Sequence, residues 1–97
     1  MLKMKSRLGP ALYATPGFTV VFGEGDRILT AQAACSSENM VAVNDIIYST
    51  RVTFATNIAT IRVWFADTSG AGPNAWTEIA DLTPLNALTF TVLADVE

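Results

Sequence analysis

Few residues in this chain could carry out catalysis. The sequence has no histidine and one cysteine, Cys35, so the commonest general base and metal ligand is missing. Cys35 follows a run of small apolar residues, and without a histidine to lower the pKa of its thiol it is predicted to be buried and inert. The glycine-containing turns are not followed by the Lys-Ser or Lys-Thr pair of a phosphate-binding loop. We therefore predict no catalytic residue, no cofactor and no enzymatic activity.

Three carboxylates flank the segment 67–75, namely Asp67, Glu78 and Asp81. Calcium prefers such oxygen ligands, but the Asp-x-Asp-x-Asp-Gly spacing of a calcium loop is missing. The odd spacing of Glu78 and Asp81 would place them on opposite faces of a strand, which disfavours paired acid and base chemistry. The sequence therefore predicts no metal site.

Aromatic side chains are the clearest candidates for binding. Trp64 and Trp76 bracket the loop 67–75, which also contains Asn74. Aromatic residues on a β face can stack on sugars or anchor a protein partner, but in a small domain they can equally fill the core. A glycan-contact site of Trp64, Trp76 and Asn74 is one hypothesis, and burial of both tryptophans is the other.

Charge is sparse and unevenly distributed. Charged residues make up 15% of the chain, against roughly 25% in soluble domains. Either part of the surface is buried against other chains, or the twelve threonines supply the polar surface instead. Half of the basic residues, Lys3, Lys5 and Arg7, lie in the first seven positions, and the rest of the chain has three basic and nine acidic residues. This acidic body lacks the basic face of a nucleic-acid-binding protein.

The strongest structural signal is the run 51–66, in which apolar and polar residues alternate as in a half-buried strand. The inward set is Ala59, Ile61, Val63 and Phe65, and the outward set is Thr60, Arg62, Trp64 and Ala66. Near Asn57 the apolar positions shift from even to odd numbers. The run is therefore either two strands split at Asn57 or one long strand with a bulge.

Other short apolar runs complete an all-β pattern. Strands are expected at 18–23, 40–44, 46–49 and 88–96, whereas 28–35 reads as a strand or a short helix and 76–82 as a bulged strand or a helical turn. Six to eight short strands separated by frequent turns predict a small β-sandwich or a jelly-roll-like barrel. The 97 residues are predicted to form one β domain, 18–97, preceded by an arm.

Residues 1–17 are expected to form this extended N-terminal arm, because two glycines and two prolines interrupt regular structure there. An ordered arm would dock on its own sheet or on a neighbouring subunit. No apolar run reaches the length of a membrane helix, and the first residues lack the pattern of a signal peptide. We expect no membrane or nucleic-acid partner and production in a reducing cytoplasm.

The segment 63–82, VWFADTSGAGPNAWTEIADL, resembles the strand–loop–strand unit of many extracellular β-sandwich modules. That resemblance implies β-sandwich architecture. The whole chain is similar to small bacteriophage virion proteins, which are often of this length, rich in Thr and Ala, poor in His and Cys, and all-β with an extended arm.

The second resemblance implies a non-enzymatic capsid decoration or cement protein. Such a protein would be assembled in the host cytoplasm and located in the virion, as a homo-oligomer (a trimer is favoured) bound to the major capsid protein or another virion protein. The side chains expected to contact a partner are Lys3, Lys5, Arg7, Leu8, Leu12, Tyr13, Arg62 and Trp64. The alternative function is a carbohydrate-binding or adhesin-like β-sandwich associated with a tail or fibre.

Overall fold

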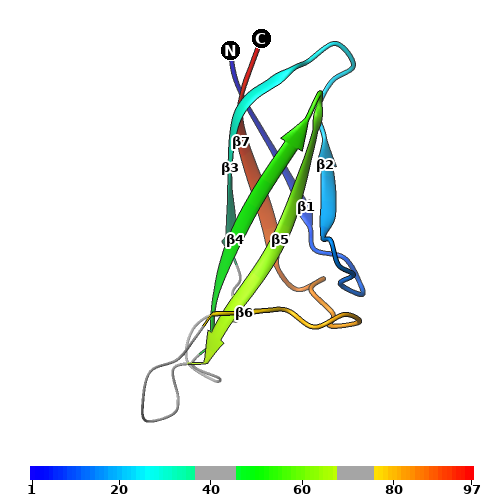
Figure 1. Ribbon diagram of the computed structural model, residues 1–97, viewed down its shortest axis with the longest axis vertical. Coiled ribbons are helices and arrows are strands. Elements are labelled where there is room, and N and C mark those ends of the chain that lie inside the picture. The colour runs from blue at the N-terminus through cyan, green and yellow to red at the C-terminus, as the bar shows by residue number, and fades with distance from the viewer. Residues whose placement is uncertain (37–45, 68–75) are drawn as a thin grey trace.

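The computed structural model describes residues 1–36, 46–67 and 76–97 and shows two antiparallel β-sheets packed together (Figure 1). The predicted all-β fold is confirmed. The strands are β1 (Leu2–Leu8), β2 (Phe18–Val21), β3 (Ile28–Ser36), β4 (Ile46–Ala55), β5 (Ile58–Asp67), β6 (Thr77–Glu78) and β7 (Thr89–Val96). One sheet has the order β1-β7-β3 and the other β2-β5-β4, with β6 paired to β5. The described ranges contain no helix that could cross a membrane.

The run 51–66 is a hairpin rather than one strand. β4 and β5 pair up to Ala55 opposite Ile58, so Thr56 and Asn57 form a two-residue turn. With this pairing an even-numbered residue of β4 always lies opposite an odd-numbered residue of β5. The shift of the apolar positions is therefore a consequence of the turn. The hypothesis of two strands split at Asn57 is confirmed, and that of one bulged strand is wrong.

The ambiguous segments are also resolved. Residues 28–35 lie in β3, so the short helix is excluded. The turn at 23–26 links β2 and β3, which belong to different sheets, so it connects the two sheets. The segment 76–82 contributes only the two-residue strand β6. The strand expected at 40–44 lies outside the described residues.

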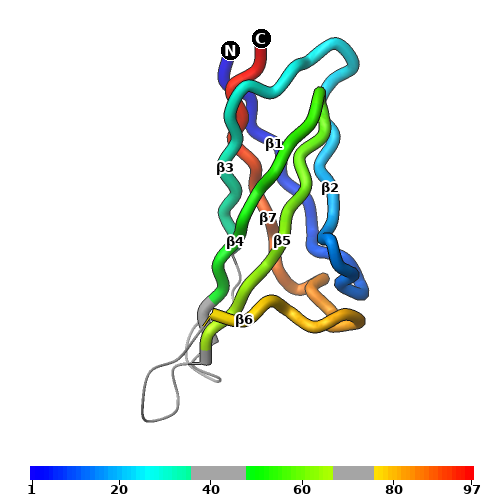
Figure 2. Tube along the Cα trace, in the orientation of Figure 1, coloured from blue at the N-terminus to red at the C-terminus, as the bar shows by residue number. Residues whose placement is uncertain are grey.

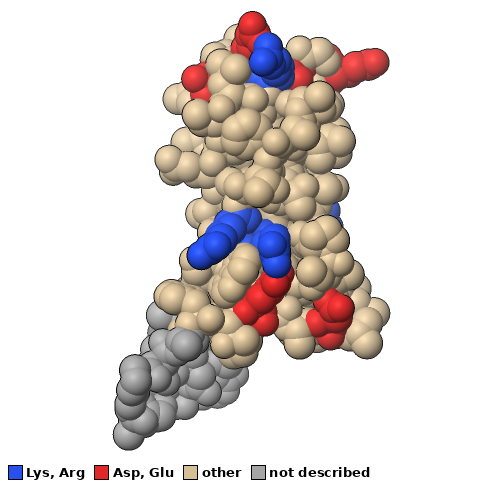
Figure 3. All heavy atoms as spheres, viewed as in Figure 1, with Lys and Arg blue, Asp and Glu red and all other residues tan. Residues whose placement is uncertain are grey.

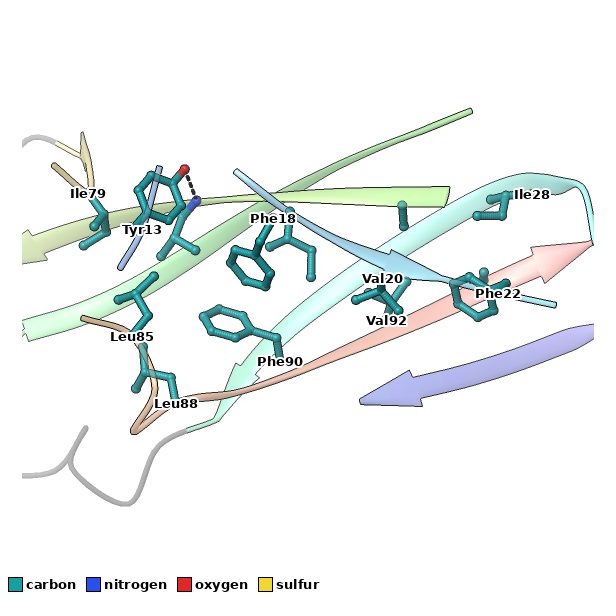
Figure 4. Close-up of a cluster of buried hydrophobic side chains, with 14 of the residues drawn as sticks. Tyr13, Phe18, Val20, Phe22, Ile28, Ile79, Leu85, Leu88, Phe90 and Val92 are labelled. Atoms are coloured by element: carbon teal, nitrogen blue, oxygen red, sulfur yellow. Dashed lines mark hydrogen bonds between the residues drawn. The ribbon is translucent and has the colours of Figure 1, made fainter. Parts of the chain in front are cut away.

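The core lies between the two sheets and combines alternate residues of their strands with side chains of the connecting segments, namely Tyr13, Phe22, Ile79, Leu85 and Leu88 (Figure 4). Phe18 of β2 and Phe90 of β7 meet edge to face with ring centroids 4.8 Å apart. The largest fully buried side chains are Tyr13, Phe90, Ile61, Val63 and Val92. Burying each such side chain contributes about 1.5–3 kcal/mol, which makes this layer the main source of stability. Of the inward residues predicted for β5, Ala59, Ile61 and Val63 are buried, whereas Phe65 is only partly buried and Ala66, predicted to face outward, is buried.

The N-terminal segment is anchored on the chain's own sheets. Leu2–Leu8 pairs with β7 along its whole length, and the following residues cross the end of the sandwich beside the segment that precedes β7 (Figure 2). There Tyr13 N donates to Thr83 O at 2.8 Å. A Cβ at Gly9 would lie 2.2 Å from Leu85 O, so only glycine fits this close approach. Of the two ways of anchoring an ordered arm, the structure shows docking on its own sheet.

Candidate functional site

The three basic residues near the N-terminus join the edges of the two sheets. Lys3, Lys5 and Arg7 alternate along β1, and their side chains reach across to β2 and the turn that follows it. Lys3 Nζ lies 2.8 and 2.9 Å from the carboxylate oxygens of Asp26, and this hydrogen bond lowers the pKa of the Asp26 carboxyl. The predicted contact residues Lys3, Lys5 and Arg7 are thus engaged within their own chain.

The alternating basic side chains also donate hydrogen bonds to backbone carbonyl groups at the free edge of β2. Lys5 Nζ donates to Val21 O, and Arg7 Nη1 donates to Thr19 O at 2.7 Å. The Arg7 guanidinium also lies 5.0 Å from the centroid of the Phe18 ring. Because unpaired edge carbonyls invite pairing with another chain, covering them with lysine and arginine protects this edge. Partners are therefore expected on the faces of the sheets rather than at this edge.

Tyr13 is fully buried, so the expectation that it contacts a partner is corrected. Its hydroxyl donates to Glu78 Oε2 at 2.9 Å, and Val63 N donates to the Tyr13 hydroxyl oxygen at 3.4 Å. Burial, together with the hydrogen bond to Glu78, raises the pKa of the Tyr13 phenol. The sequence does not show that Tyr13 is buried, because its hydrogen-bond partner Glu78 is 65 positions away.

Glu78 and Asp81 are both occupied within the chain. Arg62 holds Glu78 with two hydrogen bonds, from Nη2 to Oε1 at 2.6 Å and from Nε to Oε2 at 3.0 Å. These bonds, and then that from Tyr13, lower the pKa of Glu78. Asp81 accepts hydrogen bonds from the backbone N and Oγ1 of Thr15, both at 2.9 Å, which lower its pKa. Each carboxylate therefore holds distant segments of the chain together.

Cys35 is half-buried on β3, packed against the core. Burial raises the pKa of its thiol to about 11, so at neutral pH the thiol is protonated and a poor nucleophile. The predicted burial of Cys35 is therefore only partial.

The outer face of the sheet β1-β7-β3 is almost uncharged, and we call it the apolar face. The apolar face consists of Leu2, Met4, Ser6, Leu8, Thr30, Gln32, Ala34, Thr89, Thr91, Leu93 and Asp95. Leu2, Met4, Leu8 and Leu93 are between 43 and 72% exposed. Met4 and Leu93 lie directly opposite each other on neighbouring strands, so their side chains form a continuous patch. Of the predicted contacts, Leu8 lies on this face, and Leu12 is exposed beyond it.

Both tryptophans lie at the surface of the other sheet. Trp64 is half-buried and Trp76 is 50% exposed, so the hypothesis that they fill the core is wrong. The guanidinium carbons of Arg51 and Arg62 lie 4.8 and 5.0 Å from the centroid of the Trp64 ring. Figure 3 shows basic atoms gathered across the middle of this face, with acidic atoms beside them. Asn74, the third predicted glycan contact, lies outside the described residues.

A hollow of about 290 Å³ opens beside Trp64. It is lined by Ser49, Arg51, Trp64 and Trp76, and we call it the arginine–tryptophan hollow. Ser49 lies opposite Trp64, and Arg51 opposite Arg62, in the pairing of β4 with β5. Sequence reasoning selected the two tryptophans but missed Ser49 and Arg51. Once the two-residue turn is located, the hairpin register predicts that Ser49 and Arg51 share the face of Trp64.

No protein-family model matches this chain, and neither a curated protein nor a solved structure does. The two surfaces and their chemistry therefore carry the functional argument.

Proposed function

We propose that the protein is a non-enzymatic structural protein that binds other protein subunits through the apolar face, as a decoration or cement protein of a bacteriophage capsid. The observation that carries this proposal is the lack of charge on that face. Its single charged side chain, Asp95, already pairs with the amino group of Met1 at 3.1 Å. A partner can therefore cover the apolar face without burying an unpaired charge.

The side chains of the apolar face suit burial in a protein interface. Removing apolar surface from water contributes about 25 cal/mol per Å², and the exposed leucine and methionine side chains supply that surface. The hydroxyls of Ser6 and Thr91 bond to each other at 2.8 Å, so this polar pair can be covered without losing its hydrogen bond. The interface core of other proteins is likewise depleted in charge.

The size of the apolar face favours repeated contacts over one tight pair. Three strands about 4.8 Å apart and seven residues long, at about 3.3 Å per residue, cover roughly 330 Å². A stable two-protein interface buries about 800 Å² on each partner. A subunit that attaches to a particle through several such contacts at once gains strength by multivalency. We favour a trimer bound to the major capsid protein or another virion protein, assembled in the host cytoplasm and located in the virion.

Quantitative mass spectrometry of bacteriophage particles purified from cells that carry the gene tests this function. The wild-type protein should co-purify with the particles in a fixed ratio to the major capsid protein. The Leu93→Glu variant, which places a charge in the apolar face, should be absent from the purified particles. Ile58→Glu is the matched control, because Ile58 is similarly exposed (38% against 43%) but lies on the other sheet. Absence of the wild-type protein from the particles would refute the proposal.

A further inference from the structure

We propose that the arginine–tryptophan hollow binds an acidic saccharide, a sugar that carries one carboxylate on each ring, as uronic acids do. The hollow is formed by β4, β5 and Trp76, and the apolar face lies on the other sheet. The two surfaces can therefore be occupied at the same time. This site is independent of the proposed role in assembly.

The charge of the hollow sets the sign of its ligand. Arg51 and Arg62 are direct cross-strand neighbours, and like charges in this position are destabilising. Glu78 neutralises Arg62 through two hydrogen bonds. Among the residues that the structure describes, Arg51 has no carboxylate partner. A ligand with one negative charge would relieve the repulsion that remains between the two arginines.

The geometry of Arg51 suits a carboxylate in particular. Its guanidinium carbon lies 4.8 Å from the centroid of the Trp64 ring, and this cation–π contact restrains the flexible side chain. A guanidinium presents paired N–H donors that match the two oxygens of a carboxylate. A phosphate monoester concentrates up to about two negative charges on the one group that would face Arg51, so the neighbouring Glu78 carboxylate repels it more strongly than it repels a single carboxylate. The hollow therefore fits one carboxylate better than a phosphorylated ligand.

The remaining lining suits a sugar ring. Trp76 is 50% exposed at the hollow and offers an aromatic surface on which the C–H face of a sugar can pack. The Ser49 hydroxyl can donate to or accept from a sugar hydroxyl. The volume of about 290 Å³ lies at the lower end of the range for small-molecule sites, roughly 300–1,000 Å³. One or two sugar rings are the expected occupant.

The intrinsic fluorescence of the protein reports on this site directly. The sequence contains two tryptophans, and both line the hollow. Titration of the full chain with digalacturonate should therefore give a saturable change in tryptophan emission. The neutral analogue, digalactose, should bind at least about 10-fold more weakly because it cannot pair with Arg51. Raising the salt concentration should weaken binding of digalacturonate.

Two variants and a matched control test whether digalacturonate binds at the hollow. Calorimetry measures the binding, because one variant removes a tryptophan and so changes the fluorescence itself. Arg51→Gln and Trp76→Ala should each weaken digalacturonate binding by about 10-fold or more. Arg27→Gln changes an exposed arginine that pairs with Glu97 and should alter binding by less than about 2-fold. Arg51→Lys, which keeps the charge but not the paired donors, should give an intermediate loss and serves if Arg51→Gln does not fold.

Three results would overturn the proposal. The first is no saturable binding of digalacturonate, and the second is equal binding of digalactose. The third is binding of a triglutamate peptide as tight as that of digalacturonate, which would make the hollow a site for acidic protein segments. Leu93→Glu should leave digalacturonate binding unchanged, so failure of the saccharide site and failure of the assembly role are separate outcomes.

Discussion

Tyr13 and Glu78 connect two segments that are distant in sequence, and their contact determines how the N-terminal segment is held. The phenol is fully buried and donates to a carboxylate that Arg62 also holds. A buried hydroxyl that has a partner stabilises the fold, whereas a partner left unsatisfied costs free energy. This small network therefore binds the crossing segment to β5 and β6.

Replacing Tyr13 tests the energy of that contact. Tyr13→Phe should lower the free energy of unfolding by about 1–2 kcal/mol, because it removes a hydrogen bond to a charged group. Tyr13→Ala should lower it by about 3–5 kcal/mol, because it also leaves a cavity. Tyr48→Phe is the control, since the structure gives its hydroxyl no hydrogen bond among the described residues. Urea unfolding measures all three, and equal effects of Tyr13→Phe and Tyr48→Phe would contradict the role given to the network.

The pH dependence of stability follows from the carboxylates that accept hydrogen bonds within the chain. The folded state lowers the pKa of Asp26, Glu78 and Asp81 through hydrogen bonds from Lys3, Arg62 and Thr15 respectively. A carboxyl with a lowered pKa binds protons less readily when folded, so its contribution is present above its unfolded pKa and is lost as the pH falls.

The free energy of unfolding should therefore decrease below about pH 4.5, near the ordinary pKa values of these groups. Between pH 5.5 and 7 it should be nearly constant, because the chain has no histidine. Urea unfolding at a series of pH values measures this, and Glu78→Gln should give a shallower acid slope than the wild type. Greater stability at pH 3.5 than at pH 6 would contradict the assignment.

At the scale of elements, the hairpin β4–β5 and the edge strand β1 differ in how far the sequence predicts them. Alternation predicted the buried positions Ala59, Ile61 and Val63 because one face of β5 meets the core, but it failed at the end of the strand, where Ala66 is buried instead of exposed. β1 was missed for a physical reason. Its charged residues alternate on the side that reaches toward β2, while Leu2, Met4 and Leu8 face solvent, which reverses the usual pattern. The resulting apolar face depends on strand order, which no local pattern specifies.

The hairpin turn has an unfavourable residue at its first position. Thr56 has a φ of 53°, in the left-handed region where a β-branched residue is strained. Thr56→Gly should raise the free energy of unfolding by roughly 1 kcal/mol, because glycine adopts this conformation without a steric cost. Thr53→Gly in β4, the strand that precedes this turn, should instead lower it by about 0.5–1 kcal/mol. Denaturant unfolding distinguishes the two, and destabilisation by Thr56→Gly would contradict the strain.

At the scale of the whole molecule, the two sheets present different outer surfaces. One is the apolar face, whose single charged side chain is Asp95, and the other holds the arginine–tryptophan hollow. The basic side chains of β1 cover the edge between β1 and β2, so face-to-face contact is the expected mode of association. The low charge of the sequence predicts either surface buried against other chains or a polar surface supplied by the twelve threonines, and the apolar face is where we place a buried contact.

Light scattering over a range of protein concentrations tests this central claim most directly. The average mass of the wild-type protein should rise with concentration above the 10.4 kDa of one chain, because a face of this size supports a weak, reversible contact. Leu93→Glu should stay at the monomer mass, and Ile58→Glu should follow the wild type. A wild-type protein that remains monomeric, or a Leu93→Glu variant that associates as the wild type does, would contradict assembly through the apolar face.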